Sequence, residues 1–391
     1  MKNVLQKVLF EKGNTIVSIK ADGTVLADSF NPAVEYWDEN TSKNLCDSYY
    51  KTKKQFFFPV DAAAGTYTFF LISENGDVIQ KGQNDDIEKY GYIDTKNWKN
   101  IKEIVADFHA VGLKTDGTVV ASGYNSYGQC NVNNWNDIIS VNCSLFHTVG
   151  IKKDRTVVAC GDNSDGKCNV ADWKDVKKII CDSDYTIGIC NNGSVLYAGS
   201  KNAFSDDIVK WEDIKDIVTC SDYLVVGLKK DGTLIFSGSQ YEDQNYGELN
   251  NLVSVALAGY LVVGLDNKGK IHVTGNNPVN DFSSYNAREY ETWEDVLTLI
   301  SFNNGFIALQ KNGELKTCLP NKTAFRSLPL PKVRKWSGFT SFDCLEQDYI
   351  TGFNKMKEEA RIRFNCCRHC GGKFSGFFKK KCSVCGIEKD Y

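Results

Sequence analysis

The 391-residue chain contains 42% hydrophobic and 24% charged residues, an ordinary composition for a globular protein with a large core. Collagen-like and disordered classes are therefore excluded. The formal net charge of -3 excludes a strongly basic protein that coats nucleic acid. No apolar run approaches the roughly 20 residues that span a membrane, and residues 1–14 lack the apolar core of a signal peptide. We therefore expect no membrane association and a cytoplasmic location.

Eight predicted hairpin turns organise the chain. Each lies between two apolar or β-branched stretches, and most carry Asp-Gly or Asn-Gly, which tolerate the positive φ of a tight turn. The turn residues are Gly23, Gly76, Gly117, Arg155, Gly193, Gly232, Gly269 and Gly313. From the second turn onward they recur every 37 to 44 residues. A period of roughly 40 residues with about four short strands per unit predicts an all-β fold, the β-propeller.

The first and longest interval, Ala27 to Asp61, is rich in aromatic residues. It contains Tyr36, Trp37, Tyr49 and Tyr50, followed by three consecutive phenylalanines. Two interpretations stay open: a degenerate blade whose core these rings form, or a loop that anchors a partner, since Tyr and Trp dominate interface anchors. The four residues named are candidates for partner binding.

From Ile104 to Gly199 one pattern is written three times. A strand glycine stands five residues before the turn, which indicates close approach of a neighbouring sheet or a bulge; these are Gly112, Gly150, Gly188, Gly227 and Gly264. About twenty residues before the turn stands a tryptophan, which we expect to pack between adjacent sheets; these are Trp98, Trp135, Trp173, Trp211 and Trp293. A further copy begins at Trp336, so a strand near residues 335–344 is predicted to complete the first blade.

A second glycine stands six residues after the turn, for example Gly123 and Gly161, and the loops that follow it vary between copies. One carries Tyr124 and Tyr127, and the next carries Asp162 and Asp165 at the same places. Variable loops on a rigid scaffold are where binding residues usually lie, so Tyr124 and Tyr127 are candidates for partner binding. Gly161 to Cys168 is close to a phosphate-binding loop motif, but the repeat itself explains the spacing and no helix pattern follows.

The segments HAVGLKTDGTVVASGYNSYGQCN and HTVGIKKDRTVVACGDNSDGKCN resemble the repeats of the regulator of chromosome condensation family. The resemblance covers Lys7 to roughly Cys344. It implies a propeller, mostly of seven blades, whereas the chain has eight predicted hairpins; seven and eight blades both stay open. It also implies roles that the family fills: exchange factor for a small GTPase, enzyme inhibitor or scaffold.

The cysteines and histidines of the body form no catalytic pattern. Cysteines recur at equivalent positions, for example Cys143 and Cys181, which indicates small buried side chains in a reducing cytoplasm. His109 and His147 are also repeat-equivalent and are expected to be structural. We therefore predict no enzymatic activity. Few prolines and abundant Asn, Lys and Asp favour a bacterial origin.

The tail differs in character from the body. Residues 1–344 are predicted to form the propeller, 345–365 a helical linker and 366–391 a zinc ribbon. Two C-x-x-C pairs place four thiolates for a closed, structural site with one zinc ion; these are Cys367, Cys370, Cys382 and Cys385. Whether Cys366 or His369 joins the site stays open.

These features predict a monomeric protein-interaction scaffold, with the zinc ribbon as a second docking module. The first alternative is association with nucleic acid or chromatin through the ribbon, where Lys379, Lys380 and Lys381 stand beside phenylalanines. The second alternative is a regulator of a partner enzyme, either an exchange factor or an inhibitor.

Overall fold

The computed structural model describes most of the central part of the chain and shorter pieces of both ends. The described residues are 4–11, 15–20, 25–29, 59–65, 68–73, 75–82, 92–201, 204–220, 224–238, 249–258, 261–275, 290–302, 305–310, 315–318, 332–333, 374–375 and 381–382. No helix within these ranges is long and apolar enough to cross a membrane.

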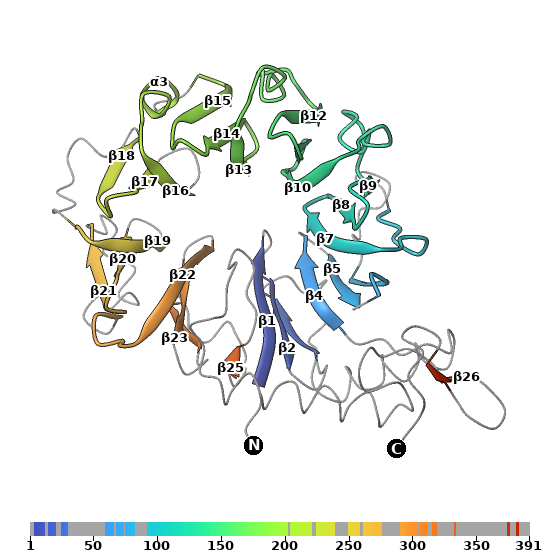
Figure 1. Ribbon diagram of the computed structural model, residues 1–391, viewed down its shortest axis with the longest axis horizontal. Coiled ribbons are helices and arrows are strands. Elements are labelled where there is room, and N and C mark those ends of the chain that lie inside the picture. Colours follow the sequence, from blue (N-terminus) through green and yellow to red (C-terminus); the bar gives the residue numbers. More distant parts are fainter. Residues whose placement is uncertain are drawn as a thin grey trace.

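The described residues form a ring of antiparallel sheets around a common axis (Figure 1). Seven sheets have three strands each, one has four, and a separate pair lies in the tail. The ring strands are β1 (Val4–Glu11), β2 (Thr15–Lys20), β3 (Val25–Ser29), β4 (Pro59–Ala64), β5 (Thr68–Ser73), β6 (Val78–Gly82), β7 (Ile101–Ala106), β8 (His109–Lys114), β9 (Val119–Gly123), β10 (Ile138–Cys143), β11 (His147–Lys152), β12 (Val157–Gly161), β13 (Val176–Cys181), β14 (Tyr185–Cys190), β15 (Val195–Gly199), β16 (Ile214–Cys220), β17 (Leu224–Lys229), β18 (Leu234–Ser237), β19 (Leu252–Ala258), β20 (Leu261–Asp266), β21 (Ile271–Thr274), β22 (Val296–Phe302), β23 (Gly305–Gln310), β24 (Leu315–Cys318) and β25 (Lys332–Val333). The all-β propeller architecture expected from the repeat period is confirmed.

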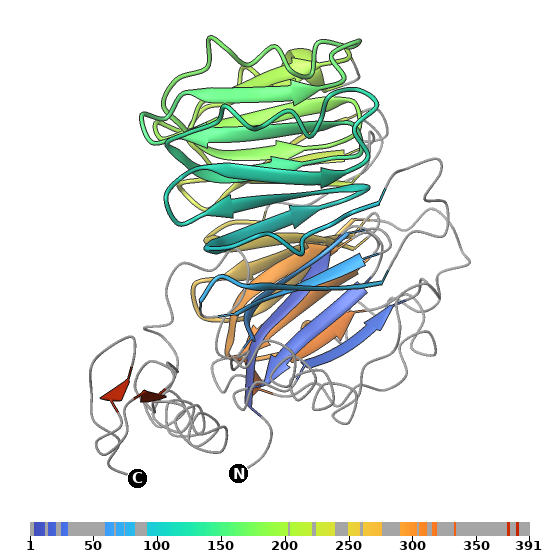
Figure 2. The ribbon, with the colours of Figure 1, turned by 90° about the vertical axis from the view of Figure 1, so that its right-hand side faces the viewer.

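In the seven three-stranded sheets the strands follow chain order, and the first strand of each lies on the inner side of the ring (Figure 1). Seen from the side, the strands of neighbouring sheets are stacked on one another (Figure 2). This arrangement places the turn between the second and third strands on one face of the ring. The turn between the first two strands, and the loop after the third, lie on the opposite face.

The ring is joined at its ends by β25, which pairs parallel to β1. Val4 is the partner of Lys332 and Leu5 is the partner of Val333, so the first sheet has the order β25-β1-β2-β3. Closure of the first sheet by a late segment was expected, although residues 335–344, where the strand was predicted, lie outside the described residues.

The predicted hairpin turns fall between the second and third strands of all eight ring sheets. In the described turns the residue is in the left-handed region, with φ of 84° at Gly117 and 68° at Arg155, where the repeat has lost its glycine. The turn carbonyl then accepts a hydrogen bond from the next sheet: Ile138 N donates to Gly117 O at 3.0 Å, and Val176 N donates to Arg155 O at 3.1 Å. The turns therefore set the spacing between successive sheets.

The expectation of about four strands per unit was wrong for the described sheets, which have three apart from the sheet that β25 joins. Between the third strand of one sheet and the first strand of the next, the segment that carries the tryptophan forms no strand in the described repeats. Between β9 and β10, for example, Val132 N donates to Cys130 O and Trp135 N donates to Val132 O, both at 2.9 Å. This segment contributes side chains to the core between sheets, but its backbone adds no strand to the hydrogen-bonded ladder of a sheet.

The strand glycines receive the tryptophan rings. A Cβ atom added at Gly112, Gly188 or Gly227 would lie 2.8 Å from the ring of the tryptophan that opens the same repeat. Trp173 also belongs to a buried cluster that includes residues of both β11 and β14, such as Val149 and Cys190. The rings therefore pack on their own sheet and against the preceding one, as the sequence predicted. The repeat of Gly269 lacks the tryptophan, and there Gly264 faces Leu252 and Leu249.

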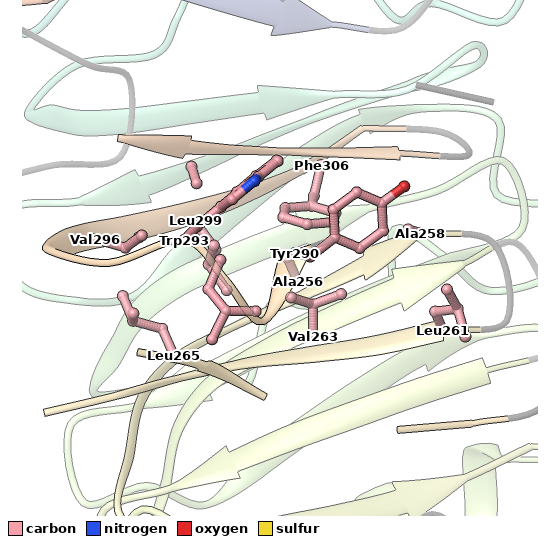
Figure 3. Packing of buried hydrophobic residues seen from close by; sticks show 12 residues of the cluster. Ala256, Ala258, Leu261, Val263, Leu265, Tyr290, Trp293, Val296, Leu299 and Phe306 are labelled. Carbon is pink, nitrogen blue, oxygen red and sulfur yellow. The ribbon is translucent and has the colours of Figure 1, made fainter. Parts of the chain in front are cut away.

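The cluster between the sheets of β19 and β22 shows how one such interface is filled (Figure 3). Tyr290, Trp293 and Phe306 pack around one another with ring centroids 5.3 to 5.7 Å apart. Ala256, Val263 and Leu265 of the preceding sheet cover them, and all six side chains are buried. Apolar area buried between sheets is the main favourable term for a fold whose single sheets have two apolar faces.

Outside the ring sheets the structure has a one-turn helix, α3 (Ser205–Ile208), and a tail pair, β26 (Phe374–Ser375) and β27 (Lys381–Cys382). The tail pair is antiparallel, with Phe374 opposite Cys382. It lies outside the ring in Figure 2. The predicted helical linker, residues 345–365, lies outside the described residues.

Replacement of Gly188 by Ala tests the packing of glycine against tryptophan. Its Cβ would lie 2.8 Å from Trp173 Cζ3, so overpacking should lower the free energy of unfolding by about 1–3 kcal/mol, as measured by chemical denaturation. The matched variant is Trp173→Leu, which removes the ring. In the Trp173→Leu background, Gly188→Ala should lower the free energy of unfolding markedly less than it does in the parent protein. Equal losses in the two backgrounds would contradict the packing of Gly188 against Trp173.

Candidate partner-binding face

The structure describes four of the predicted site residues. Tyr124 and Tyr127 lie in the loop after β9, and Lys381 and Cys382 lie in β27. The other candidates, Tyr36, Trp37, Tyr49, Tyr50, Cys367, Cys370, Lys379, Lys380 and Cys385, lie outside the described residues.

The loop that carries the two tyrosines is held by its own hydrogen bonds. Asn125 Oδ1 accepts from Cys130 N at 2.7 Å, and Asn125 O accepts from Gly128 N at 3.0 Å. Gly128 has a φ of 83°, and a Cβ there would lie 2.8 Å from Asn131 Nδ2, so the turn requires glycine. The side chain of Gln129 is buried and accepts from Tyr127 N at 3.0 Å. The loop is therefore fixed before any partner arrives.

Three aromatic rings meet on this face. Tyr127 lies edge-to-face against Tyr124, at 6.1 Å between centroids, and against Phe146, at 5.4 Å. Phe146 comes from the turn between β10 and β11 of the next sheet, so the group spans two sheets. Tyr127 is 51% exposed although both neighbours contact it. Sequence reasoning missed Phe146; its signal was its place beside His147, one repeat after Phe108.

The loop after β12 has the same backbone but presents different side chains. Asn163 Oδ1 accepts from Cys168 N at 2.8 Å, and Asn163 O accepts from Gly166 N at 3.1 Å, as in the first loop. Asp162 and Asp165 stand where the tyrosines stood. One scaffold therefore offers an aromatic surface in one repeat and an acidic surface in the next.

A buried lysine supports the acidic loop. Lys167, only 1% exposed, takes the place of Gln129 and bonds Asp162 Oδ2 at 2.7 Å and Asp165 Oδ2 at 3.6 Å. Burial by itself would raise the pKa of Asp162, but the hydrogen bonds from Lys167 and Ser164 outweigh it and hold that pKa below its ordinary value. The lysine of the motif that resembles a phosphate-binding loop is thus paired within its own loop.

Histidine and threonine bridge adjacent sheets beneath these loops. His147 Nε2 lies 2.8 Å from Thr186 Oγ1, and that hydroxyl donates to Lys167 O at 2.9 Å. Because the single hydroxyl proton is used there, Nε2 must be the donor to Oγ1. Ser144 Oγ lies 2.7 Å from His147 Nδ1 and donates to it. His109 and Thr148 form the same bridge one repeat earlier, at 2.7 Å. The prediction that both histidines are structural is confirmed.

The cysteines near this face are thiols with little tendency to ionise. Burial raises the pKa of Cys130 and of Cys160 to about 12, and that of Cys168 to about 11. Cys143 and Cys181 are buried, as predicted for strand positions. None of the described cysteines named here is in a disulfide.

The candidate metal centre is described at one residue only. Cys382 in β27 is 3% exposed and is not in a disulfide. A hairpin as short as β26 and β27 has no core of its own, so a buried thiol at its centre fits a ribbon that a metal holds together. Among the residues that the structure describes, no group of three potential ligands gathers.

Residues 107–129 and 138–167 match the family model of the Regulator of chromosome condensation (RCC1) repeat. These two segments are therefore similar to RCC1 repeats. These two matches contain both candidate loops almost completely, and they are two of the three copies between Ile104 and Gly199.

No curated protein matches this chain. Among solved structures, it is similar to the CRINKLY WD40 ectodomain of the Arabidopsis thaliana receptor kinase ACR4, with 13% identity, coverage of 70% of this chain and 96% of that one, and a TM-score of 0.44. It is also similar to human WBSCR16, with 14% identity, coverage of 63% of this chain and 85% of that one, and a TM-score of 0.44. A third similar structure is Prp20p from Saccharomyces cerevisiae, with 15% identity, coverage of 76% of this chain and 80% of that one, and a TM-score of 0.40. Identities and scores this low do not transfer a function.

Replacement of Thr186 by Val tests the bridge between sheets. It leaves the buried Nε2–H of His147 without its acceptor, so the free energy of unfolding should fall by about 1–3 kcal/mol in chemical denaturation. The next repeat has no such histidine–threonine pair: Tyr185 stands at the position of His147, and Val225 stands at the position of Thr186. The double variant His147→Tyr, Thr186→Val should therefore regain much of the loss. A Thr186→Val protein as stable as the parent would refute the bridge.

Proposed function

We propose that the chain is a non-enzymatic protein-interaction scaffold that binds a macromolecular partner through loops on one face of the propeller. The observation that carries this proposal is the pair of loops after β9 and β12. The hydrogen bonds that Asn125 and Asn163 accept within the two loops are the same, but the residues at the variable positions change from tyrosine to aspartate. A scaffold kept constant while its exposed residues vary is typical of a recognition surface.

The rigidity of the loops supports binding. Loop ordering costs free energy on association, and a loop already fixed by Asn125 and Gly128 has paid most of it during folding. The exposed Tyr127 gives a large, rigid contact surface at low entropic cost. The described histidines support a non-enzymatic role, since His109 and His147 are buried in bridges between sheets and His272 is paired with Asp266.

We also propose eight blades for the propeller, spanning residues 1–344, with the linker at 345–365 and the ribbon at 366–391. The ring sheets of the described residues support eight, because each holds one of the eight predicted turns. Cys367, Cys370, Cys382 and Cys385 would hold zinc in a closed site, which stabilises the ribbon and leaves no position for a substrate. A cytoplasmic location agrees with described cysteines that are free thiols and form no disulfides.

The zinc proposal predicts one metal ion per chain. Full-length protein should contain about one equivalent of zinc by mass spectrometry of metals, and Cys382→Ser should lower this well below half, since one of four thiolates is lost. The matched control is Cys168→Ser, which alters a half-buried thiol of the propeller and should keep the zinc. Equal zinc in the parent and in Cys382→Ser would contradict the ribbon.

The scaffold proposal is tested by partner capture with the full chain. Tyr127→Ala should lower capture of a protein partner about tenfold or more, as expected for a central aromatic anchor. Tyr92→Ala is the matched control, because Tyr92 is also exposed, at 44%, but lies in a segment outside the three-ring group. Binding is quantified with the purified partner once mass spectrometry has identified it.

The alternative function through the tail is separated in the same experiment. Full chain in which Lys379, Lys380 and Lys381 are replaced by Gln should keep its partner if the propeller loops carry binding. Capture that is indifferent to Tyr127, is lost with the lysines and disappears on nuclease treatment would instead support a nucleic-acid role through the tail.

A further inference from the structure

We propose that the face formed by Tyr124, Tyr127, Phe146, Asp165 and Asp184 binds a cationic segment of a partner protein, one rich in Arg or Lys. This inference rests on the proposed function, because it names the chemistry of the partner that the same loops would bind. We call these five residues the acidic-aromatic face.

The face is continuous across two boundaries between sheets, and Phe146 joins its halves. The ring of Phe146 contacts Tyr127 at 5.4 Å, while its carbonyl oxygen accepts from Asp162 N at 2.9 Å. Asp184 occupies the same position one repeat later, since its carbonyl accepts from Ser200 N at 3.1 Å. By the repeat geometry, Asp184 lies beside the loop of Asp165 as Phe146 lies beside the loop of Tyr127.

The formal charge of these loops is negative. Residues 124–130, 143–147, 162–168 and 181–185 contain four aspartates, Asp162, Asp165, Asp182 and Asp184, and a single lysine, Lys167. The ammonium of Lys167 is buried and bonded to Asp162, so it offers little charge to the solvent. The side chain of Asp165 is 44% exposed, and its contact with Lys167 is the longer one, at 3.6 Å. The charge presented to a partner is therefore that of carboxylates.

Aromatic rings beside exposed carboxylates suit a guanidinium or ammonium group. A cation is attracted to the face of a tyrosine ring, and a carboxylate nearby accepts its hydrogen bonds. Arginine uses both, because its planar group stacks on rings and pairs with carboxylates through two bonds. A purely apolar partner fits less well, since it would remove Asp165 from water without a hydrogen-bond donor.

The order of the residues suits an extended segment. Rings stand at the first boundary between sheets and carboxylates at the next, so side chains along one peptide would meet a stacking surface and then an acidic one. The fixed loops mean that the ordering cost falls mainly on the peptide.

Fluorescence anisotropy tests the inference with the full chain and labelled twelve-residue peptides. One peptide alternates Arg with Ser, a second has Gln in place of Arg, and a third has Glu. The arginine peptide should bind with an affinity that falls as salt rises, and the other two should not bind detectably. Tyr127→Ala and Asp165→Asn should each weaken the binding about two- to fivefold, and together by roughly the product.

Two matched controls separate the face from general attraction. Glu212→Gln removes the same charge from an exposed residue on the opposite, turn face, and Tyr92→Ala removes an exposed ring elsewhere. Both should leave the affinity unchanged. Equal binding of the Gln peptide, or equal loss in Glu212→Gln and Asp165→Asn, would overturn the inference. If the arginine peptide does not bind while capture of a protein partner still depends on Tyr127, the inference fails and the proposed function stands.

Discussion

Contact between neighbouring sheets is the constraint on which the rest of this structure depends. A three-stranded sheet has two faces to cover, and here each face is covered by the next sheet in the ring. From Gly112 to Gly227 the contact is made in the same way: a tryptophan on a strand glycine fills the space, and a turn carbonyl accepts a hydrogen bond from the following sheet. The loops that carry the candidate binding residues depend on these contacts. Each loop leaves the third strand of one sheet and continues into the tryptophan segment, which packs against the sheets.

The sequence predicted those parts of the fold that require one particular residue type at a fixed position. The turns need positive φ and the tryptophans need a position without a side chain, so glycine marks both, and even Arg155 was found from its spacing. The strand number was predicted less well. A segment such as residues 129–137 forms no strand: the side chains of Val132 and Trp135 serve the core, and the backbone hydrogen bonds that their N–H groups donate are local.

The candidate face was predicted in part. Tyr124 and Tyr127 were found because they differ between copies, which is a property of sequence. Phe146 was missed because its contact with Tyr127 joins residues of different sheets, and its place beside His147 marks only a repeat position, not that contact. The burial of Lys167 was also unforeseen: in sequence it is a lysine in a polar loop, and only the positions of Asp162 and Asp165 show that its charge is already neutralised.

The pairing of β25 with β1 has a consequence for the order in which the molecule assembles. Its partners, Val4 and Lys332, stand near the two ends of the ring, so this is the contact of greatest sequence separation in the sheet. Such a contact is costly until the intervening sheets have shortened the path between the ends, which makes closure a late event in folding. Until then β1 has an unpaired edge, the kind of surface on which chains aggregate. The short β25 thus acts as edge protection, and a chain that lost it would be exposed to association with other copies before its sheets had fully formed.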